Sequence, residues 1–262
     1  MKNKHGRQNG FNLIEVMVTM TIGLLITVSA LQIMLGGSKS SKTSEHTAYA
    51  LEHGRQSLRI LSQSIRRAGY RSQPNLIAPE PFYTGQCEGE STCTKDGGGI
   101  NSDRLAIQYE PTVDSLGSIV DCTGTKVPIG ELTADVYFVA PDPSNHNINT
   151  LFCRGYDPIN EVARGSRSEA LIPGVERIQV LYGLEASGSG FVNRYITADD
   201  VTDWRQIQVV RVAVLVGAGV RTPQYGLKSR TYNLLYSGDL TLKDKSLRYI
   251  FSTATRINNS GI

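Results

Sequence analysis

The chain opens on a sharp change from polar to apolar positions. Residues 1–10 are polar and basic, whereas residues 11–35 are apolar almost throughout. No charged residue and no proline occurs in residues 16–38. As an α-helix, the apolar run would span about 37 Å, enough to cross a bilayer core of about 30 Å with some tilt. The pattern therefore predicts a transmembrane helix within residues 11–37.

Helical periodicity continues beyond the apolar run. Residues 38–44 are polar and follow Gly36 and Gly37, where we expect the helix to loosen. Apolar residues then recur at helical spacing while arginines occupy the other faces, which is typical of an amphipathic helix. We predict one helix over residues 12–68, ended by Gly69, whose apolar stripe packs on a sheet; a partner-binding heptad is the alternative. The stripe consists of Leu51, Leu58, Leu61, Ile65 and Ala68.

The region of residues 70–262 carries strand patterns and no further long helical pattern. Residues 74–103 are rich in Pro, Gly and Ser and predict a long loop. Apolar and polar positions then alternate in short segments, and no repeated βαβ pattern occurs. Strands that follow one helix predict an α+β fold, with a helix over 38–69 packed on an antiparallel sheet in one domain, residues 38–262. The expected strands are 105–109, 136–138, 178–184, 207–216 and 247–251.

The junction between the polar and apolar segments reads GFNLIEV over residues 10–16 and resembles the type IV prepilin signature. The resemblance implies that a prepilin peptidase cuts between Gly10 and Phe11 and leaves the apolar run in the mature chain. It also implies that Phe11 becomes N-methylated and that Glu15 is needed for assembly. A secretory signal would have a shorter apolar run, and a plain signal anchor would leave Glu15 unexplained.

Glu15 is an acid inside an apolar run. Such an acid costs about 2.5–3.5 kcal/mol at the bilayer centre and less near the interface. The resemblance implies that Glu15 pairs with the free Phe11 amine of a neighbouring subunit when the helices bundle in a fibre, and that the pair fixes their register. The alternative is a carboxylate that reaches the headgroups around a lone anchor.

Longer stretches of the chain resemble the PilW-like minor pilins. They include ALEHGRQSLRILSQSIRRAGYR, LIPGVERIQVLYGL and LRYIFSTATRIN. The resemblance implies a pilin-like fold and a minor pilin at the start or tip of a type IV pilus, serving twitching motility, adhesion or DNA uptake. The partners it implies are prepilin peptidase, other minor and major pilins, the inner membrane and the pilus assembly machinery. A type II secretion pseudopilin is the nearest alternative, and a membrane-anchored periplasmic enzyme is an alternative from another class.

One turn departs from the resemblance. Relatives often carry an acid-rich turn after a strand that ends in Tyr-Gly-Leu, whereas residues 185–190 here read EASGSG. A hard cation needs several oxygen ligands, and only Glu185 remains at this place. We therefore expect a plain hairpin turn and no calcium site there.

The charge distribution favours a cytoplasmic N-terminus. The chain holds 27 Lys and Arg against 24 Asp and Glu, and three of these bases are Lys2, Lys4 and Arg7. The rest of the chain is therefore balanced and indicates no basic surface for direct nucleic-acid binding. Because basic residues before a transmembrane helix stay in the cytoplasm, we expect a single-pass inner-membrane protein with a periplasmic domain, later found in the fibre at the cell surface.

The four cysteines, Cys87, Cys93, Cys122 and Cys153, form no C-x-x-C pair, so a zinc knuckle or a thioredoxin-like motif is not expected. Their even number behind a membrane segment favours two disulfides in an oxidising compartment; four buried thiols are the alternative. We expect Cys87–Cys93, within a short loop, and Cys122–Cys153, beside two strands that could be neighbours. The second bridge closes the longer loop and should stabilise the fold more.

No catalytic motif accompanies these features. The sequence contains no nucleophile elbow, P-loop or dinucleotide-binding motif. His46 and His53 lie seven residues apart, too far for an i, i+4 metal pair, and are expected on a solvated helix face. We therefore expect no enzyme, no cofactor, and no catalytic or metal-binding residues. The acids Asp199, Asp200 and Asp203 are expected near helix N-termini.

Overall fold

The structure is a computed structural model that divides into two compact units, Met1–Glu45 and His46–Ile262. The domain boundary expected before residue 38 stays a prediction. The residues described by the structure are 10, 12–73, 77–87, 89–99, 101–113, 117–185, 191–217 and 227–259.

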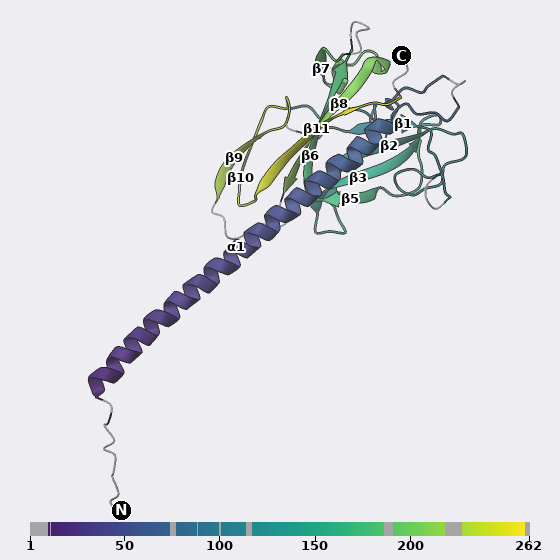
Figure 1. Ribbon diagram of the computed structural model, residues 1–262. Helices are drawn as coiled ribbons and strands as arrows, with labels where there is room; N and C mark the ends of the chain where they lie inside the picture. The colour runs from purple at the N-terminus through teal and green to yellow at the C-terminus, as the bar shows by residue number, and fades with distance from the viewer. Residues whose placement is uncertain are drawn as a thin grey trace, which may run out of the picture. The chain divides into compact units, whose positions relative to one another are not determined.

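Helix α1 (Leu13–Arg67) is one unbroken element of 55 residues (Figure 1). The predicted loosening at Gly36 and Gly37 is wrong, because the helix continues through both glycines. The helix ends where Gly69 adopts a left-handed φ of +73°. An added Cβ at Gly69 would lie 2.9 Å from the backbone oxygen of Asn259, so glycine is also required there by space.

Antiparallel strands make up the rest of the described fold (Figure 1). The first sheet has the order β1-β2-β3-β4, with β5 also paired to β3, and the second has the order β11-β8-β6-β7; β9 and β10 form a separate hairpin. The predicted α+β fold, a long helix with antiparallel sheets, is confirmed. The strands are β1 (Leu105–Tyr109), β2 (Thr133–Asp142), β3 (Ile148–Asp157), β4 (Val162–Ala163), β5 (Glu169–Pro173), β6 (Val175–Leu184), β7 (Arg194–Ile196), β8 (Ile207–Gly217), β9 (Lys228–Asn233), β10 (Asp239–Asp244) and β11 (Arg248–Arg256), with short 3₁₀ turns η1 (Ala198–Asp200) and η2 (Trp204–Gln206).

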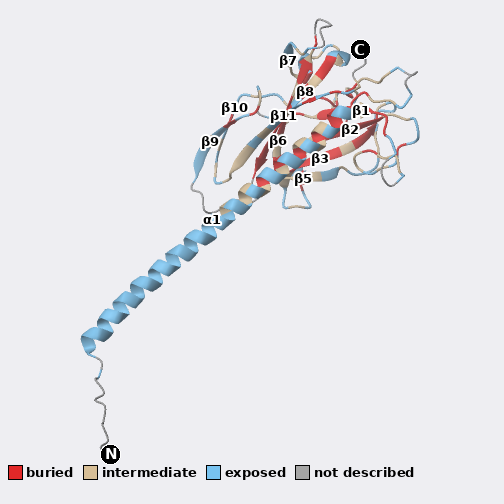
Figure 2. Ribbon diagram, viewed as in Figure 1, coloured by how far each residue is buried: buried red, intermediate tan, exposed pale blue. Residues whose placement is uncertain are grey.

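Strand β8 is buried on both faces, which explains its nearly continuous apolar sequence (Figure 2). On one face, Val212 and Val214 belong to the same buried cluster as Leu61 and Ile65 of α1. On the other face, Ala213 and Leu215 pack with apolar residues of the β9–β10 region. The hairpin therefore covers the side of the second sheet that α1 leaves open.

The buried face of α1 differs from the predicted apolar stripe. Leu61, Ile65 and Ala68 are fully buried as expected, but Leu51 is 36 % exposed. The face that meets the sheet consists mainly of small residues: Ala50, Gly54, Ser57, Leu61, Ser64 and Ile65 are the buried positions of the helix. Small side chains are needed because the sheet comes close to the helix axis.

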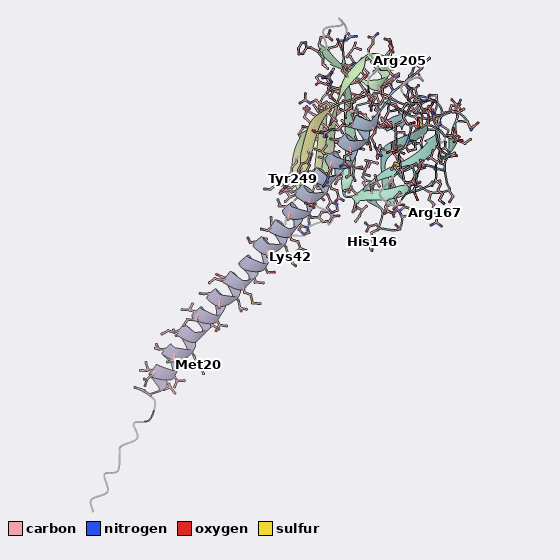
Figure 3. The ribbon with its side chains drawn as sticks, turned by 45° about the vertical axis from the view of Figure 1, so that its right-hand side comes forward. Met20, Lys42, His146, Arg167, Arg205 and Tyr249 are labelled. Atoms are coloured by element: carbon pink, nitrogen blue, oxygen red, sulfur yellow. A yellow bond between two sulfur atoms is a disulfide. The ribbon has the colours of Figure 1, made fainter. Side chains whose placement is uncertain are left out.

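The helix approaches the sheet closely at Gly54. A Cβ added there would lie 2.3 Å from two ring carbons of Phe251 in β11. Two hydrogen bonds between hydroxyl groups accompany this packing along the same strand. The hydroxyl groups of Thr47 and Tyr249 (labelled in Figure 3) lie 3.2 Å apart. The Thr255 hydroxyl donates to that of Ser62 at 3.0 Å. Strand β11 and the second half of α1 therefore fit each other along most of the strand.

The two disulfides of the structure join the cysteine pairs expected from the sequence. Cys87 is bonded to Cys93, with Cα atoms 5.1 Å apart, and Cys122 to Cys153, with Cα atoms 6.3 Å apart. The first lies in a buried cluster with Tyr83 and Val136, within the segment predicted as a long loop. The second ties the segment before β2 to β3 across 31 residues.

The close approach at Gly54 generates a stability prediction. We expect Gly54→Leu to lower the free energy of unfolding by about 1–3 kcal/mol, because the new side chain overlaps the Phe251 ring. Gly37→Leu is the matched control in the same helix, since nothing lies within 4 Å of a Cβ added there. Urea unfolding of the full chain in detergent measures both. The cost at Gly54 should shrink in a Phe251→Ala background, and equal costs in both backgrounds would contradict the packing argument.

Candidate functional site: the assembly helix and its attachment

The first turn of α1 contains the acid singled out by the sequence. Asn12 precedes the helix, and its carbonyl oxygen accepts the backbone N–H of Glu15 at 2.9 Å and of Val16 at 3.2 Å. Glu15 is exposed in this turn, where a carboxylate is favoured by the positive end of the helix dipole. Gly10 lies just before the helix, and Phe11 lies outside the described residues.

The first part of α1 is exposed along its whole length (Figure 2), and its sequence is apolar on every face. Leu13 and Ile33 are each 76 % exposed, and Met20, labelled in Figure 3, is 71 % exposed. The helix is long and apolar enough to cross a membrane, with a mean hydropathy of 2.0 over its most apolar window. Exposed apolar surface of this size indicates contact with lipid or with other helices.

The hydroxyl groups of this segment are compatible with an apolar environment. Thr27 donates to the carbonyl of Gly23 at 2.7 Å, and Ser29 donates to that of Leu25 at 2.8 Å. Each hydroxyl therefore makes a hydrogen bond within the helix and does not require water. Glu15 is the single charged residue in residues 12–38. A positive charge that neutralises its carboxylate must therefore come from outside this segment.

At its other end, α1 is attached to the first sheet by a buried polar network. Asp135 of β2 is completely buried and accepts hydrogen bonds from the Tyr109 hydroxyl at 2.8 Å and from the Cys122 backbone N–H at 3.1 Å. The Arg67 guanidinium lies 3.8 Å from the same carboxylate and 4.7 Å from the centre of the Tyr109 ring. Ser64, one turn earlier, bonds the buried Tyr137 hydroxyl at 2.6 Å.

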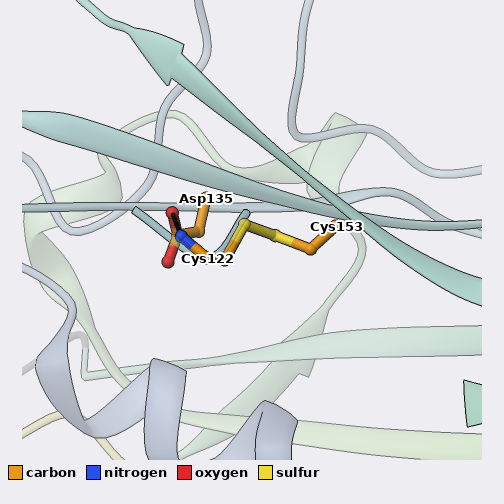
Figure 4. A group of neighbouring side chains, drawn as sticks. All are labelled: Cys122, Asp135 and Cys153. Carbon is orange, nitrogen blue, oxygen red and sulfur yellow. Dashed lines mark hydrogen bonds between the residues drawn. A yellow bond between two sulfur atoms is a disulfide. The ribbon is translucent and has the colours of Figure 1, made fainter. Parts of the chain in front are cut away.

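The Cys122–Cys153 disulfide completes this network (Figure 4). One potential ligand atom from each of Cys122, Cys153 and Asp135 lies within 4.8 Å of the others. Because the two sulfur atoms are bonded to each other, they are not thiolates, and the group is no metal-binding set. The bridge instead holds Cys122 where its N–H can reach the carboxylate.

The pKa of Asp135 reflects this position. Burial raises the pKa of the carboxyl to about 6, although its hydrogen bonds and the charge of Arg67 act to lower it. The network therefore stabilises an acid that would otherwise be much more costly to bury.

Other residues singled out by the sequence are placed as follows. His53 bonds the carbonyl of Pro173 at 2.9 Å and stacks on Tyr49 with ring centres 3.8 Å apart, so it joins α1 to β5 and is not on a solvated face as expected. Asp203 caps η2 by accepting the N–H of Arg205, as expected of a helix N-terminal acid. The turn expected at residues 185–190 lies outside the described residues from 186 onward.

Two family models match the chain. The model of the prokaryotic N-terminal methylation motif matches residues 5–31, and the model of type IV pilus-assembly protein W matches residues 136–259. The chain is similar to type IV pilus-assembly protein W over slightly less than half of its length, and it carries the N-terminal methylation motif. The methylation motif implies processing by prepilin peptidase and a role in pilin assembly. Pilin families are structural and not enzymatic.

Structure and sequence comparisons add two findings. A type IV-like pilin from Thermus thermophilus is similar at 13 % identity and a TM-score of 0.44, over 80 % of this chain and 98 % of that one. A comparison with curated proteins found no match.

The buried acid at the attachment site predicts that the stability of the folded chain depends on pH. A carboxyl whose pKa is raised in the folded state holds its proton more tightly there, so the free energy of unfolding should fall as pH rises from about 4 to about 6. A rise of about two pKa units corresponds to about 3 kcal/mol. Asp135→Asn should remove this part of the slope.

Denaturant unfolding of the full chain in detergent between pH 4 and 7 measures this effect. Asp239→Asn, which changes an exposed carboxylate of β10, is the control and should keep the slope. If Asp135→Asn unfolds with the same pH dependence as the unchanged chain, the buried acid is not its source.

Proposed function

We propose that this chain is a minor pilin that is inserted in the inner membrane through residues 11–37 and then built into a type IV pilus, at its start or its tip. The observation that carries the proposal is the first part of α1, in which apolar side chains are exposed on every face and Glu15 is the one charged residue of residues 12–38. Such a surface needs lipid before assembly and other apolar helices after it. In this proposal, the pilus that contains this subunit serves twitching motility, adhesion or DNA uptake.

The same proposal assigns a topology. Lys2, Lys4 and Arg7 precede the apolar segment, which favours a cytoplasmic N-terminus. The two disulfides lie in the part of the chain that follows the segment, and disulfides persist in an oxidising compartment such as the periplasm. Residues 38–262 are therefore proposed to fold on the periplasmic side.

Cleavage between Gly10 and Phe11 supplies the missing charge for Glu15. It creates an amine on Phe11, which we propose becomes N-methylated and stays cationic. In a bundle of pilin helices, this amine of one subunit would neutralise Glu15 of its neighbour. A wrongly staggered pair would leave both charges unpaired in an apolar bundle, which costs several kcal/mol. The pair therefore acts as a register device for incoming subunits, which include other minor pilins and the major pilin.

Mass spectrometry of the mature protein tests the processing step. We expect a chain that begins at an N-methylated Phe11, because the peptide bond after Gly10 marks the change from polar to apolar sequence. A variant with Gly10→Val should remain full length, since a β-branched side chain would then stand at the cleavage site. Recovery of an intact Met1, or of an N-terminus near residue 30, would contradict the proposed processing.

Substitution of Glu15 tests assembly. Glu15→Gln keeps the size of the side chain and removes its charge, so membrane insertion should be unchanged or easier while incorporation into pili falls at least tenfold. Glu45→Gln is the matched control in the same helix and should assemble normally, since Glu45 is exposed beyond the apolar segment. Sheared pili, quantified by immunoblot in a strain whose piliation requires this protein, give the result. Normal incorporation of Glu15→Gln would remove the register role.

A further inference from the structure

Strand β11 forms one edge of the second sheet, where it lies beside β8 and along α1 (Figure 1). Its nine residues pair with β8 from Arg248–Gly217 to Arg256–Val209 without a shift in register. Among the described residues, no other strand pairs with β11. One side of the strand is therefore open to a further strand.

The backbone groups on the open side belong to the even-numbered residues of β11. The Ile257 N–H, just after the strand, donates to the carbonyl of Gln208 at 2.9 Å. In an antiparallel pair, residues that exchange hydrogen bonds alternate with residues that do not. The odd-numbered residues of β11 therefore bond to β8, and the N–H and C=O groups of Ile250, Ser252 and Ala254 point to the open side. All three residues are exposed.

This open side lacks the features that normally prevent an edge strand from pairing with another chain. Such features are prolines, bulges, charged side chains, a very short strand or a covering segment. Residues 249–255 contain no proline and no charged residue, and their pairing with β8 contains no bulge. A long, regular and uncharged edge is a template for strand addition.

The other edges of the described sheets do carry such features. Strand β7 has three residues and β4 has two. Strand β5 has a register shift in its pairing with β3 and ends at Pro173. Residues 81–83 cover β1, where the Gln108 N–H donates to the carbonyl of Pro81, and residues 101–103 bond the part of β6 beyond β7. Strands β9 and β10 contain charged residues. The open side of β11 is therefore an exception among these edges.

The charges at the two ends of β11 disfavour a second copy of this chain as the added strand. In the antiparallel register that uses the whole strand, centred on Ser252, Arg256 of each copy would lie opposite Arg248 of the other. Like charges directly opposite each other destabilise a strand pair. Arg248 already binds Glu176 at 2.6 Å and Asp244 at 2.7 Å. Arg256 is exposed and has no ion-pair partner within the described parts of the chain, so an acid on a different chain would complement it.

We propose that the open side of β11 binds an extended segment of a different polypeptide as an additional antiparallel strand. The segment carries an acidic residue at its N-terminal end, opposite Arg256, followed by small or β-branched residues opposite Ala254, Ser252 and Ile250. Its backbone groups pair with those that the even-numbered residues turn to the open side. Antiparallel pairing is favoured because it is slightly more stable per residue than parallel pairing. This binding requires only the folded chain, so it can be tested apart from pilus assembly.

Binding of a synthetic peptide to the full chain in detergent tests the proposal. The probe is as long as β11 and consists of Glu followed by alternating Val and Thr, with a fluorescent label. We expect saturable binding by fluorescence anisotropy, and slower amide hydrogen exchange at Ile250, Ser252 and Ala254 when the peptide is bound. A peptide with Lys in place of the Glu should bind at least tenfold more weakly. Absence of saturable binding, unchanged exchange at the three amides, or equal binding of the two peptides would overturn the proposal.

Proline substitutions locate the binding edge. Ser252→Pro removes an N–H that is not bonded to β8, and proline is tolerated at such edge positions. We therefore expect a Tm close to that of the unchanged chain and a peptide affinity at least tenfold lower. Ser252→Ala keeps the N–H and is the matched control, which should bind normally. Thr253→Pro removes an N–H that bonds β8 and should lower the Tm. A folded Ser252→Pro variant with unchanged peptide affinity would overturn the proposal.

Light scattering of the chain without peptide tests the choice of partner. We expect no self-association through β11, because of the opposed arginines. Self-association of the unchanged chain that Ser252→Pro abolishes would assign the open side to a second copy and would overturn the proposed occupant.

Discussion

One helix has to satisfy two kinds of surroundings along its length, and the rest of the structure follows from this constraint. Residues near Leu13 to Leu35 expose apolar side chains on all faces, whereas residues from Ala50 onward bury one narrow face. A helix that is apolar on all faces suits lipid or a bundle of similar helices, and one with a narrow buried face suits a sheet. The antiparallel sheets supply the surface for the second part only.

Periodic patterns were sufficient to predict the long helix and strands at the places of β1, β2, β6, β8 and β11, but the expected strands did not include β3 in the middle of the first sheet. Sequence reasoning also misjudged the buried face of α1, since a search for large apolar residues cannot recognise Gly54 and Ser57 as contact positions. These small residues are selected by the closeness of Phe251, which is distant in sequence. Strands such as β9, with the sequence KSRTYN, lack alternation because they cover the second sheet from outside and keep most side chains exposed.

The polar groups of the core were hidden from sequence reasoning for a similar reason. Asp135 stands in a strand and looks like an ordinary polar position, but β1, β2 and the end of α1 surround it completely. Asp96 and Asp103 likewise form no recognisable sequence motif. They come together only because Lys95 and Arg104 pair their backbones at the base of the loop between them. Motifs at the N-terminus are local and so can be recognised directly, whereas these groups depend on long-range pairing. The cleavage and methylation positions can therefore be predicted from the sequence and remain predictions, whereas the attachment network cannot be predicted in this way.

The narrow face of α1 also has a mechanical consequence. A pull along the helix axis displaces all of its contacts with β11 and β8 at the same time, because they are arranged along the helix and not at one end. Such a load must slide the Phe251 ring past Gly54, where it packs against the helix backbone. It must also break the Thr47–Tyr249 and Thr255–Ser62 hydrogen bonds at the same time. A load applied across the axis would instead break them one after another, at lower force. The domain is therefore built to resist tension in one direction, that of its own helix, and is weaker against peeling from the side.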